Sequence, residues 1–108
     1  MLQVGAKAIK AGYSILEFDS ESGRVEHLGT RRTMADAMLF LAEDFQAFAQ
    51  SCGEACGEPP TNLLRQTQFI VGPGRLERIV RFRKQPGVKL PVMSICDSDG
   101  NELQALKA

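Results

Sequence analysis

The sequence contains no tryptophan, one tyrosine and one histidine among its 108 residues. Proteins that bind single-stranded nucleic acid stack bases on exposed aromatic side chains, so this scarcity counts against that function. Lysine and arginine balance aspartate and glutamate at 13 each. Because the net charge is zero, the chain has no bulk attraction for nucleic acid or for an anionic membrane.

Cysteine and long apolar runs are also scarce. The three cysteines are an odd number and lack the pattern of a secreted disulfide framework. No run approaches the roughly 20 apolar residues that cross a bilayer, and Lys7 and Lys10 interrupt residues 1–10, where a signal peptide would be apolar. We therefore expect a cytoplasmic protein with no membrane partner. Cys52 and Cys56 lack a second pair of Cys or His ligands, so no metal and no cofactor is expected.

The remaining composition is that of an ordinary globular protein, with 44% hydrophobic and 24% charged residues. The length fits a single domain over residues 1–108. Charge is divided along the chain: residues 1–60 carry 5 basic and 9 acidic groups (net −4), and residues 61–108 carry 8 and 4 (net +4). The two oppositely charged halves of the sequence can attract each other within one chain or between two copies of it.

An amphipathic helix over residues 33–53 is the clearest element. Thr33 supplies an N-cap hydroxyl, and Gly53 offers a C-terminal stop. Between them, apolar residues recur at steps of four and three, the spacing of one helical face: Met34, Met38, Leu41, Phe45, Phe48 and Cys52. A helix of this kind needs a sheet to pack against.

Strand-like stretches joined by short turns supply that sheet. They cover residues 12–19, 24–29, 65–71, 76–84 and 89–96. In the third stretch, Thr67, Phe69 and Val71 alternate with Gln66, Gln68 and Ile70. Short connections favour antiparallel pairing. The expected fold class is α+β, with two layers: one long helix packed on a mostly antiparallel five-stranded sheet, in the order β-β-α-β-β-β. Residues 53–62 are expected to form a loop, and residues 102–108 are a tail with no assigned structure.

The fifth predicted strand is apolar on both faces. One face carries Leu90 and Val92, and the other carries Met93 and Ile95. Such a strand is usually buried on both faces, but one helix covers only one. Leu39 and Phe40 also lie off the apolar stripe of the helix. These observations predict a homo-oligomer, with a dimer favoured, whose interface contains Leu39, Phe40, Val92, Met93 and Ile95. The alternative is that the N-terminal segment or the C-terminal tail covers the second face.

A basic cluster occupies the predicted hairpin of residues 75–89. Arg78, Arg81 and Arg83 are its candidate ligand-binding residues, since guanidinium groups bind phosphate and carboxylate. Phe82 alternates with Arg81 and Arg83 and therefore lies on the opposite face of the strand, away from any base bound by the arginines. The alternative is a solvated strand face that resists edge aggregation.

Few residues are candidates for catalysis. Glu43 and Asp44 are the candidates for a base, because a subunit closing over them would raise the pKa of one carboxyl. His27 has no spacing that pairs it with a cysteine nucleophile. Residues 97–101 (D-S-D-G-N) fall short of a calcium loop because Gly100 comes two residues early, so they predict a turn.

The order of elements resembles the hot-dog domains: a strand pair, a long helix, then antiparallel strands ending in the D-x-D-G-N turn of residues 97–101. The resemblance implies a dimer that cleaves or binds acyl thioesters at its interface, with Glu43 or Asp44 as the base. The glycine-rich helix entry of many such domains is replaced here by G-T-R-R-T at residues 29–33.

Three functional hypotheses follow. The first, which we prefer for want of a convergent catalytic set, is a self-associating, non-enzymatic module that binds a small molecule or a protein partner. The second is a hot-dog-like acyl-thioester hydrolase or binding protein. The third is nucleic-acid binding through the basic hairpin of residues 75–89, which the missing stacking residues disfavour.

Overall fold

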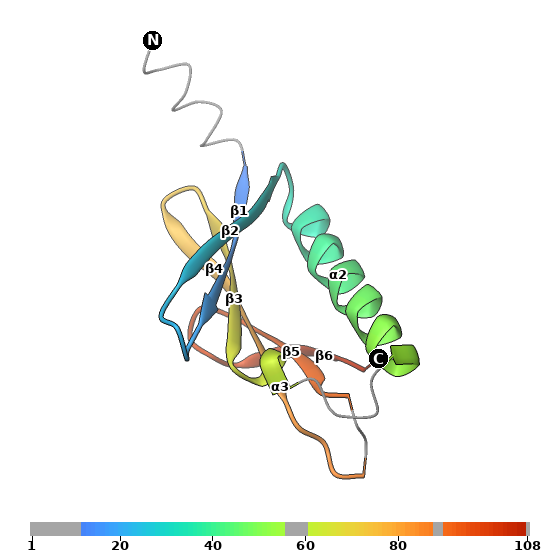
Figure 1. Ribbon diagram of the computed structural model, residues 1–108. Helices are drawn as coiled ribbons and strands as arrows, with labels where there is room; N and C mark the ends of the chain where they lie inside the picture. Colours follow the sequence, from blue (N-terminus) through green and yellow to red (C-terminus); the bar gives the residue numbers. More distant parts are fainter. Residues whose placement is uncertain (1–11, 56–60, 88–89, 108) are drawn as a thin grey trace.

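The computed structural model describes residues 12–55, 61–87 and 90–107 (Figure 1). It is an α+β structure with six strands, in the order β-β-α-β-β-β-β. The strands are β1 (Tyr13–Asp19), β2 (Val25–Arg31), β3 (Gln66–Gly72), β4 (Arg75–Arg83), β5 (Val92–Cys96) and β6 (Glu102–Leu106). The helices are α2 (Met34–Ala55), between β2 and β3, and the short α3 (Thr61–Leu64), immediately before β3. Neither described helix combines the length and apolarity that crossing a membrane requires.

The sixth strand corrects the expectation of five. Residues 102–106 (E-L-Q-A-L) are too short and too polar to identify a strand on their own. The preceding turn brings them back beside β5: the Gly100 N–H donates to the Asp97 carbonyl at 3.0 Å, and Gly100 has a φ of 91°. The Asp97 carboxylate accepts the N–H groups of Asp99 and Asn101 at 2.9 Å each. The edge of β5 therefore takes β6 as an antiparallel partner.

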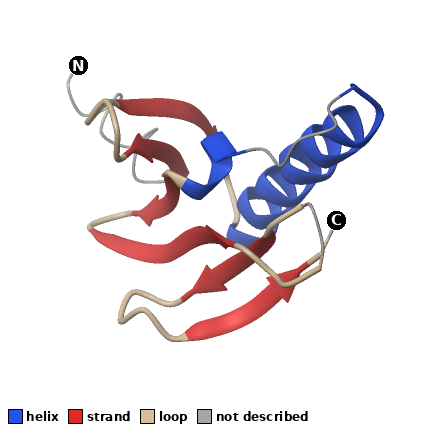
Figure 2. Ribbon diagram, turned by 60° about the horizontal axis from the view of Figure 1, so that its bottom comes forward, coloured by secondary structure: helices blue, strands red, loops and turns tan. Residues whose placement is uncertain are grey.

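All neighbouring strands are antiparallel, in the spatial order β2-β1-β3-β4-β5-β6. Because β2 and β3 both pair with β1, helix α2 connects them by crossing over β1. Each pairing adds a twist of about 20–25°, and Figures 1 and 2 show β5 and β6 turned well away from β1 and β2. Helix α2 lies on one side of this twisted sheet.

Helix α2 begins as predicted and runs further. The Thr33 Oγ1 accepts the Asp36 N–H at 3.1 Å, which is the N-cap contact expected from the sequence. The most buried residues follow steps of four along the helix: Ala37, Leu41, Phe45 and Ala49. The helix continues through Gly53 to Ala55, so the prediction of a stop at Gly53 is wrong. A glycine inside a helix costs only about 1 kcal/mol relative to alanine, which does not end a helix by itself.

Register assigns the strand residues to two faces, since paired residues share a face. Ile15 pairs with Ile70, and Val80 pairs with Ile95. These four residues form one core with Ala37, Leu41 and Phe45 of α2, so we call their side of the sheet the inner face. The opposite side, which we call the outer face, carries the alternate residues, including a cross-strand row of Leu16, Phe69 and Ile79.

Strand β5 is buried on both faces within a single chain. Met93 and Ile95 belong to the inner core and are 0% and 1% exposed, and Val92 on the outer face is 2% exposed. Part of the outer cover is polar, because Glu102 of β6 accepts hydrogen bonds from Ser94 of β5 and from Arg83 of β4. The chain itself thus supplies the cover that the sequence analysis assigned to a second copy. Val92, Met93 and Ile95 offer no surface to a dimer.

The Glu102 contacts predict a pH-dependent contribution to stability. The Ser94 hydrogen bond, followed by the charge of Arg83, lowers the pKa of Glu102 below its ordinary value. A lowered pKa in the folded state gives stability that is complete above the ordinary glutamate pKa of about 4.3 and is lost as the pH falls through the lowered pKa. We expect Glu102→Gln to unfold at lower urea than the wild type at pH 7, and the difference to shrink as the pH falls below the ordinary glutamate pKa.

Glu43→Gln is the matched control, because Glu43 is exposed on α2. Urea midpoints of the three proteins across this pH range check the expectation. A Glu102→Gln deficit that persists unchanged at the acid end would contradict the assignment.

Candidate functional site

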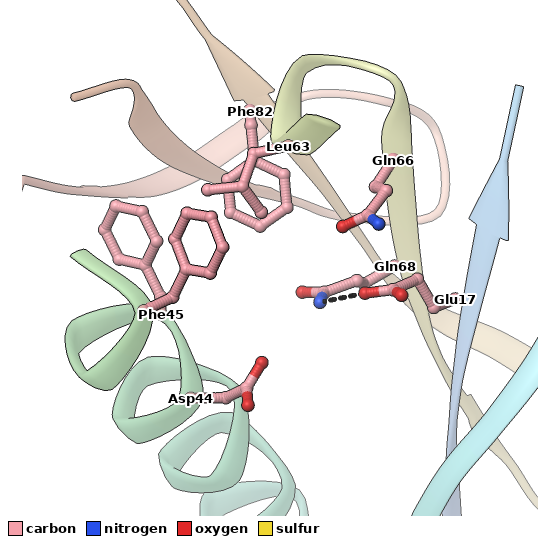
Figure 3. Close-up of a pocket in the computed structure, with 8 residues that line it drawn as sticks. Glu17, Asp44, Phe45, Leu63, Gln66, Gln68 and Phe82 are labelled. Carbon is pink, nitrogen blue, oxygen red and sulfur yellow. Dashed lines mark hydrogen bonds between the residues drawn. The ribbon is translucent and has the colours of Figure 1, made fainter. Parts of the chain in front are cut away.

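A cavity of about 240 Å³ lies between the second half of α2 and the inner face of the sheet (Figure 3). Its apolar wall consists of Phe45 and Phe48 of α2, Leu63 of α3 and Phe82 of β4. Its polar wall consists of Glu17 of β1, Asp44 of α2, and Gln66 and Gln68 of β3. We call it the Gln68 cavity. Drug-sized ligands occupy pockets of about 300–1,000 Å³, so this cavity suits a smaller molecule.

Gln68 is the most buried polar residue of this wall, at 2% exposure. It lies on the central strand β3, paired with Glu17 on one side and Val80 on the other, so its side chain projects from the inner face. Its amide nitrogen donates to the Glu17 carboxylate at 2.9 Å. Figure 3 shows the amide extending into the space between the sheet and Asp44 of the helix.

The amide oxygen of Gln68 has no hydrogen-bond donor among the described residues. A carboxylate only accepts hydrogen bonds, so the contact with Glu17 requires the amide nitrogen, which leaves the oxygen pointing away from Glu17 (Figure 3). A buried acceptor without a donor costs about 1–3 kcal/mol. Such a group in a folded protein requires an explanation, and a ligand that donates a hydrogen bond supplies one.

The apolar wall is built by long-range packing. The rings of Phe45 and Phe82 are 5.7 Å apart between centroids and tilted by 38°. Leu63 is 7% exposed and comes from the short helix α3, which packs against β4. Residues from α2, α3 and β4 therefore meet at one surface, opposite the polar residues of β1 and β3.

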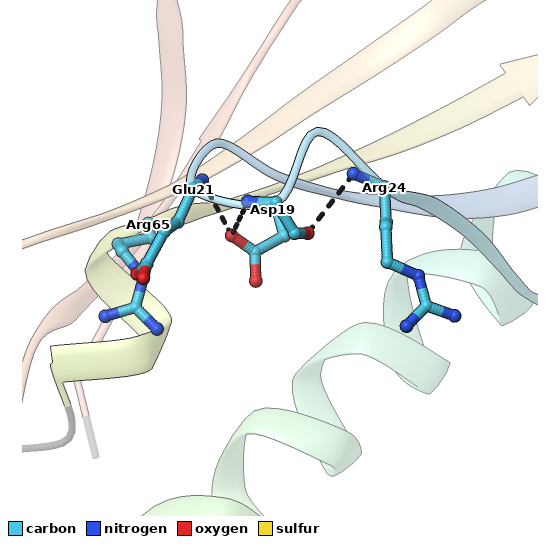
Figure 4. A network of polar contacts seen from close by, with 5 residues as sticks. Asp19, Glu21, Arg24 and Arg65 are labelled. Carbon is cyan, nitrogen blue, oxygen red and sulfur yellow. Dashed lines mark hydrogen bonds and ion pairs between the residues drawn. The ribbon is translucent and has the colours of Figure 1, made fainter.

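A second, more open depression of about 390 Å³ adjoins the Gln68 cavity and shares Glu17 and Gln66 with it. Its other lining residues are Asp19, Ser22, Arg24 and Glu26. They surround the β1–β2 turn, where the Asp19 carboxylate accepts the Glu21 N–H at 2.8 Å and Glu21 pairs with Arg65 at 2.7 Å (Figure 4). Carboxylates outnumber cations in this lining by three to one, from Glu17, Asp19 and Glu26 against Arg24.

The two carboxylates proposed as bases from the sequence are separated by the structure. Both carboxylates are exposed, but Asp44 lines the Gln68 cavity and Glu43 is not among its described lining residues. The sequence analysis expected a second subunit to enclose such a group. In the structure, Asp44 faces the inner face of its own sheet (Figure 3).

The arginines proposed to bind an anion do not share a face. Arg78 pairs with Ile70 and therefore lies on the inner face. Arg81 and Arg83 alternate with it and lie on the outer face, where Arg83 contacts Glu102 at 3.4 Å. Hairpin β3–β4 thus does not gather the three guanidinium groups into one site.

Leu39 and Phe40, proposed for an interface, are at the surface of α2. Leu39 is 55% exposed. Phe40 is half-buried, with the Arg31 guanidinium 4.6 Å above its ring. A cation over an aromatic ring is attracted to its face, so Arg31 already occupies one side of Phe40.

The single histidine has no nucleophile beside it. His27 of β2 is exposed and lies 3.2 Å from the Thr30 hydroxyl. Cys96 is buried in β5, four strand positions away, or about 19 Å along the sheet. Cys56 and the side chain of Cys52 lie outside the described residues. Within the described part of the chain, no group of three or more His, Cys, Asp or Glu side chains is arranged to hold a metal ion.

Comparison with known protein families, with curated proteins and with solved structures finds no match for this chain. The site must therefore be interpreted from its own geometry. Sequence reasoning singled out Asp44 but missed Glu17, Gln66 and Gln68. It placed both glutamines on one face of a strand with Ile70, but alternation does not say which face of a strand meets a helix.

Proposed function

We propose that this protein binds a small molecule in the Gln68 cavity. The observation that carries the proposal is the buried Gln68 amide oxygen, which lies at the cavity without a donor among the described residues. Apolar walls with a few placed polar groups are typical of small-molecule sites. The contact with Glu17 fixes the orientation of the Gln68 amide, so the acceptor is positioned before any ligand arrives.

The cavity favours this function over acyl-thioester chemistry. Coenzyme A thioesters carry several phosphate charges, and the ionisable groups among the described lining residues are the carboxyls of Glu17 and Asp44. Like charges repel at short range, which disfavours such a substrate. Nucleic-acid binding is disfavoured in turn because Arg78 lies on the face opposite Arg81 and Arg83.

Replacement of Gln68 tests the proposal because it should raise the stability of the protein while abolishing ligand binding. Gln68→Met keeps the side-chain volume and removes the buried oxygen without a donor. We expect the free energy of unfolding to rise by about 1 kcal/mol, because Glu17 is half-buried and water can replace the lost donor. The variant should also lose ligand binding.

Two measurements check this expectation. Urea unfolding gives the stability, with Gln104→Met on the exposed part of β6 as a control that should change it by less than about 0.5 kcal/mol. Amide NMR shifts with small cationic, neutral and anionic aromatic fragments report binding. If no fragment moves the resonances of Phe45, Gln68 or Phe82, the cavity is not a binding site.

Self-association is the second candidate property, and the outer face supports it. Leu16, Phe69 and Ile79 form a half-buried apolar row across three adjacent strands, on the side opposite α2. Phe18 pairs with Val25, which is 64% exposed, on the same face. A self-complementary contact between two copies would bury these residues. This surface replaces β5, Leu39 and Phe40 as the basis for proposing a dimer.

A further inference from the structure

We propose that the ligand of the Gln68 cavity is a small organic cation, an ammonium or guanidinium group bearing N–H donors and joined to an apolar body. This inference rests on the proposed binding function and specifies its chemistry. The juxtaposition that carries it is a set of hydrogen-bond acceptors on one wall of the cavity and a set of aromatic rings on the other.

The available hydrogen-bonding groups of the polar wall are mainly acceptors. The carboxylates of Glu17 and Asp44 accept hydrogen bonds and cannot donate them when ionised. The amide nitrogen of Gln68 is already engaged by Glu17, which leaves its oxygen as the group facing the cavity. Gln66 is the remaining polar lining residue and can present either end of its amide. A ligand with several N–H donors satisfies this wall, whereas a carboxylate or phosphate does not.

The charges around the cavity also favour a cationic ligand. The described lining of the cavity contains two carboxylates and no lysine, arginine or histidine. The adjoining depression adds Asp19 and Glu26 against Arg24. A concave surface lined by one sign of charge concentrates ligands of the opposite sign, so cations are favoured at the entrance as well as inside.

The aromatic wall suits an organic cation rather than a hydrated metal ion. Phe45, Phe48 and Phe82 present rings to the same space. A ring face attracts a cation within about 6 Å of its centroid, and it also buries the apolar body of an amine. The volume of about 240 Å³ accommodates one aromatic ring with a short alkylammonium chain.

Three probes of nearly the same shape test whether the cavity selects a positively charged ligand or binds any aromatic molecule that fits. They are phenethylammonium, phenethyl alcohol and phenylpropanoate, which carry positive, zero and negative charge on the same aromatic body. We expect phenethylammonium to bind at least about tenfold more tightly than the other two by NMR titration, since a hydrogen bond to a charged group is the stronger kind.

Two substitutions on adjacent residues of α2 provide the matched comparison. Asp44→Asn removes a carboxylate that lines the cavity, and Glu43→Gln removes a neighbouring carboxylate, also exposed, that is not among the described lining residues. Both change the net charge by one unit. We expect Asp44→Asn to weaken phenethylammonium binding about tenfold and to leave phenethyl alcohol unaffected, and Glu43→Gln to leave both probes within about twofold of the wild type.

The outcomes distinguish this inference from the function on which it rests. Equal binding of the three probes, tighter binding of phenylpropanoate, or equal losses in the two variants would overturn the cation assignment while the cavity remained a binding site. If other fragments bind in the cavity and phenethylammonium does not, the cation assignment is also wrong. If no fragment or probe shifts the cavity resonances, the binding function itself fails.

Discussion

Replacing Met93 with alanine is expected to lower the free energy of unfolding by about 2–5 kcal/mol. Met93 is 0% exposed, pairs with Phe82 on β4 and Leu106 on β6, and belongs to the inner core. Its truncation removes buried apolar area and leaves a cavity that the surrounding side chains cannot fully close. Because domains are stable by only about 5–15 kcal/mol, this single change removes a large share of the total.

Urea unfolding of Met93→Ala and of Leu39→Ala measures the contrast. Leu39 is 55% exposed on α2, so its truncation should cost less than about 0.5 kcal/mol. The comparison is made at two protein concentrations. If β5 is sealed inside one chain, the Met93→Ala loss is the same at both. A loss that appears only at the higher concentration would mean that a second copy covers β5.

Placing a lysine at Phe69 is expected to weaken the self-association proposed above at least about a hundredfold. Phe69 lies in the middle of the apolar row on the outer face, between Leu16 and Ile79. A two-fold contact repeats each substitution twice, and a charge buried without a partner costs several kcal/mol. In the monomer, the long lysine chain reaches water from a half-buried site, so the variant should still fold.

Sedimentation velocity over a wide concentration range measures this effect, with thermal unfolding as the check on folding. Leu39→Lys places the same charge on the exposed surface of α2 and should leave the association unchanged. If Leu39→Lys rather than Phe69→Lys dissociates the protein, the interface lies on the helix, as the sequence first indicated. A wild-type protein that stays monomeric at all concentrations would refute self-association altogether.

Gln68 shows why the candidate site could be found only in part from the sequence. The alternation of Gln66, Gln68 and Ile70 against Thr67, Phe69 and Val71 was visible in advance. Both faces of that strand mix polar and apolar residues, so hydrophobicity alone did not select the inner one. The pairing of Ile70 with Ile15 selects it, and the same pairing places two glutamines against the helix. The sequence identified Asp44 as a candidate site residue, but Glu17, Gln66 and Gln68, which line the same cavity, come from strands distant in the chain.

The sequence by itself determined the local elements of this protein. The Thr33 cap and the apolar spacing placed α2 within two residues at its C-terminal end, and turn residues such as Gly23, with a φ of 74°, and Gly100 set the hairpins. These features depend on backbone conformation and on contacts between near neighbours. They fix where the chain is helical and where it reverses.

Tertiary structure alone decided how β5 and the Gln68 cavity are enclosed. Strand β6 forms because the edge of β5 offers it hydrogen bonds, and Glu102 of β6 then accepts hydrogen bonds from Ser94 and Arg83 on the outer side of the sheet. The Gln68 cavity combines side chains from β1, β3, β4, α2 and α3. Both features depend on pairings between segments far apart in the chain, and the sequence of a single strand does not show which of its faces will meet the helix.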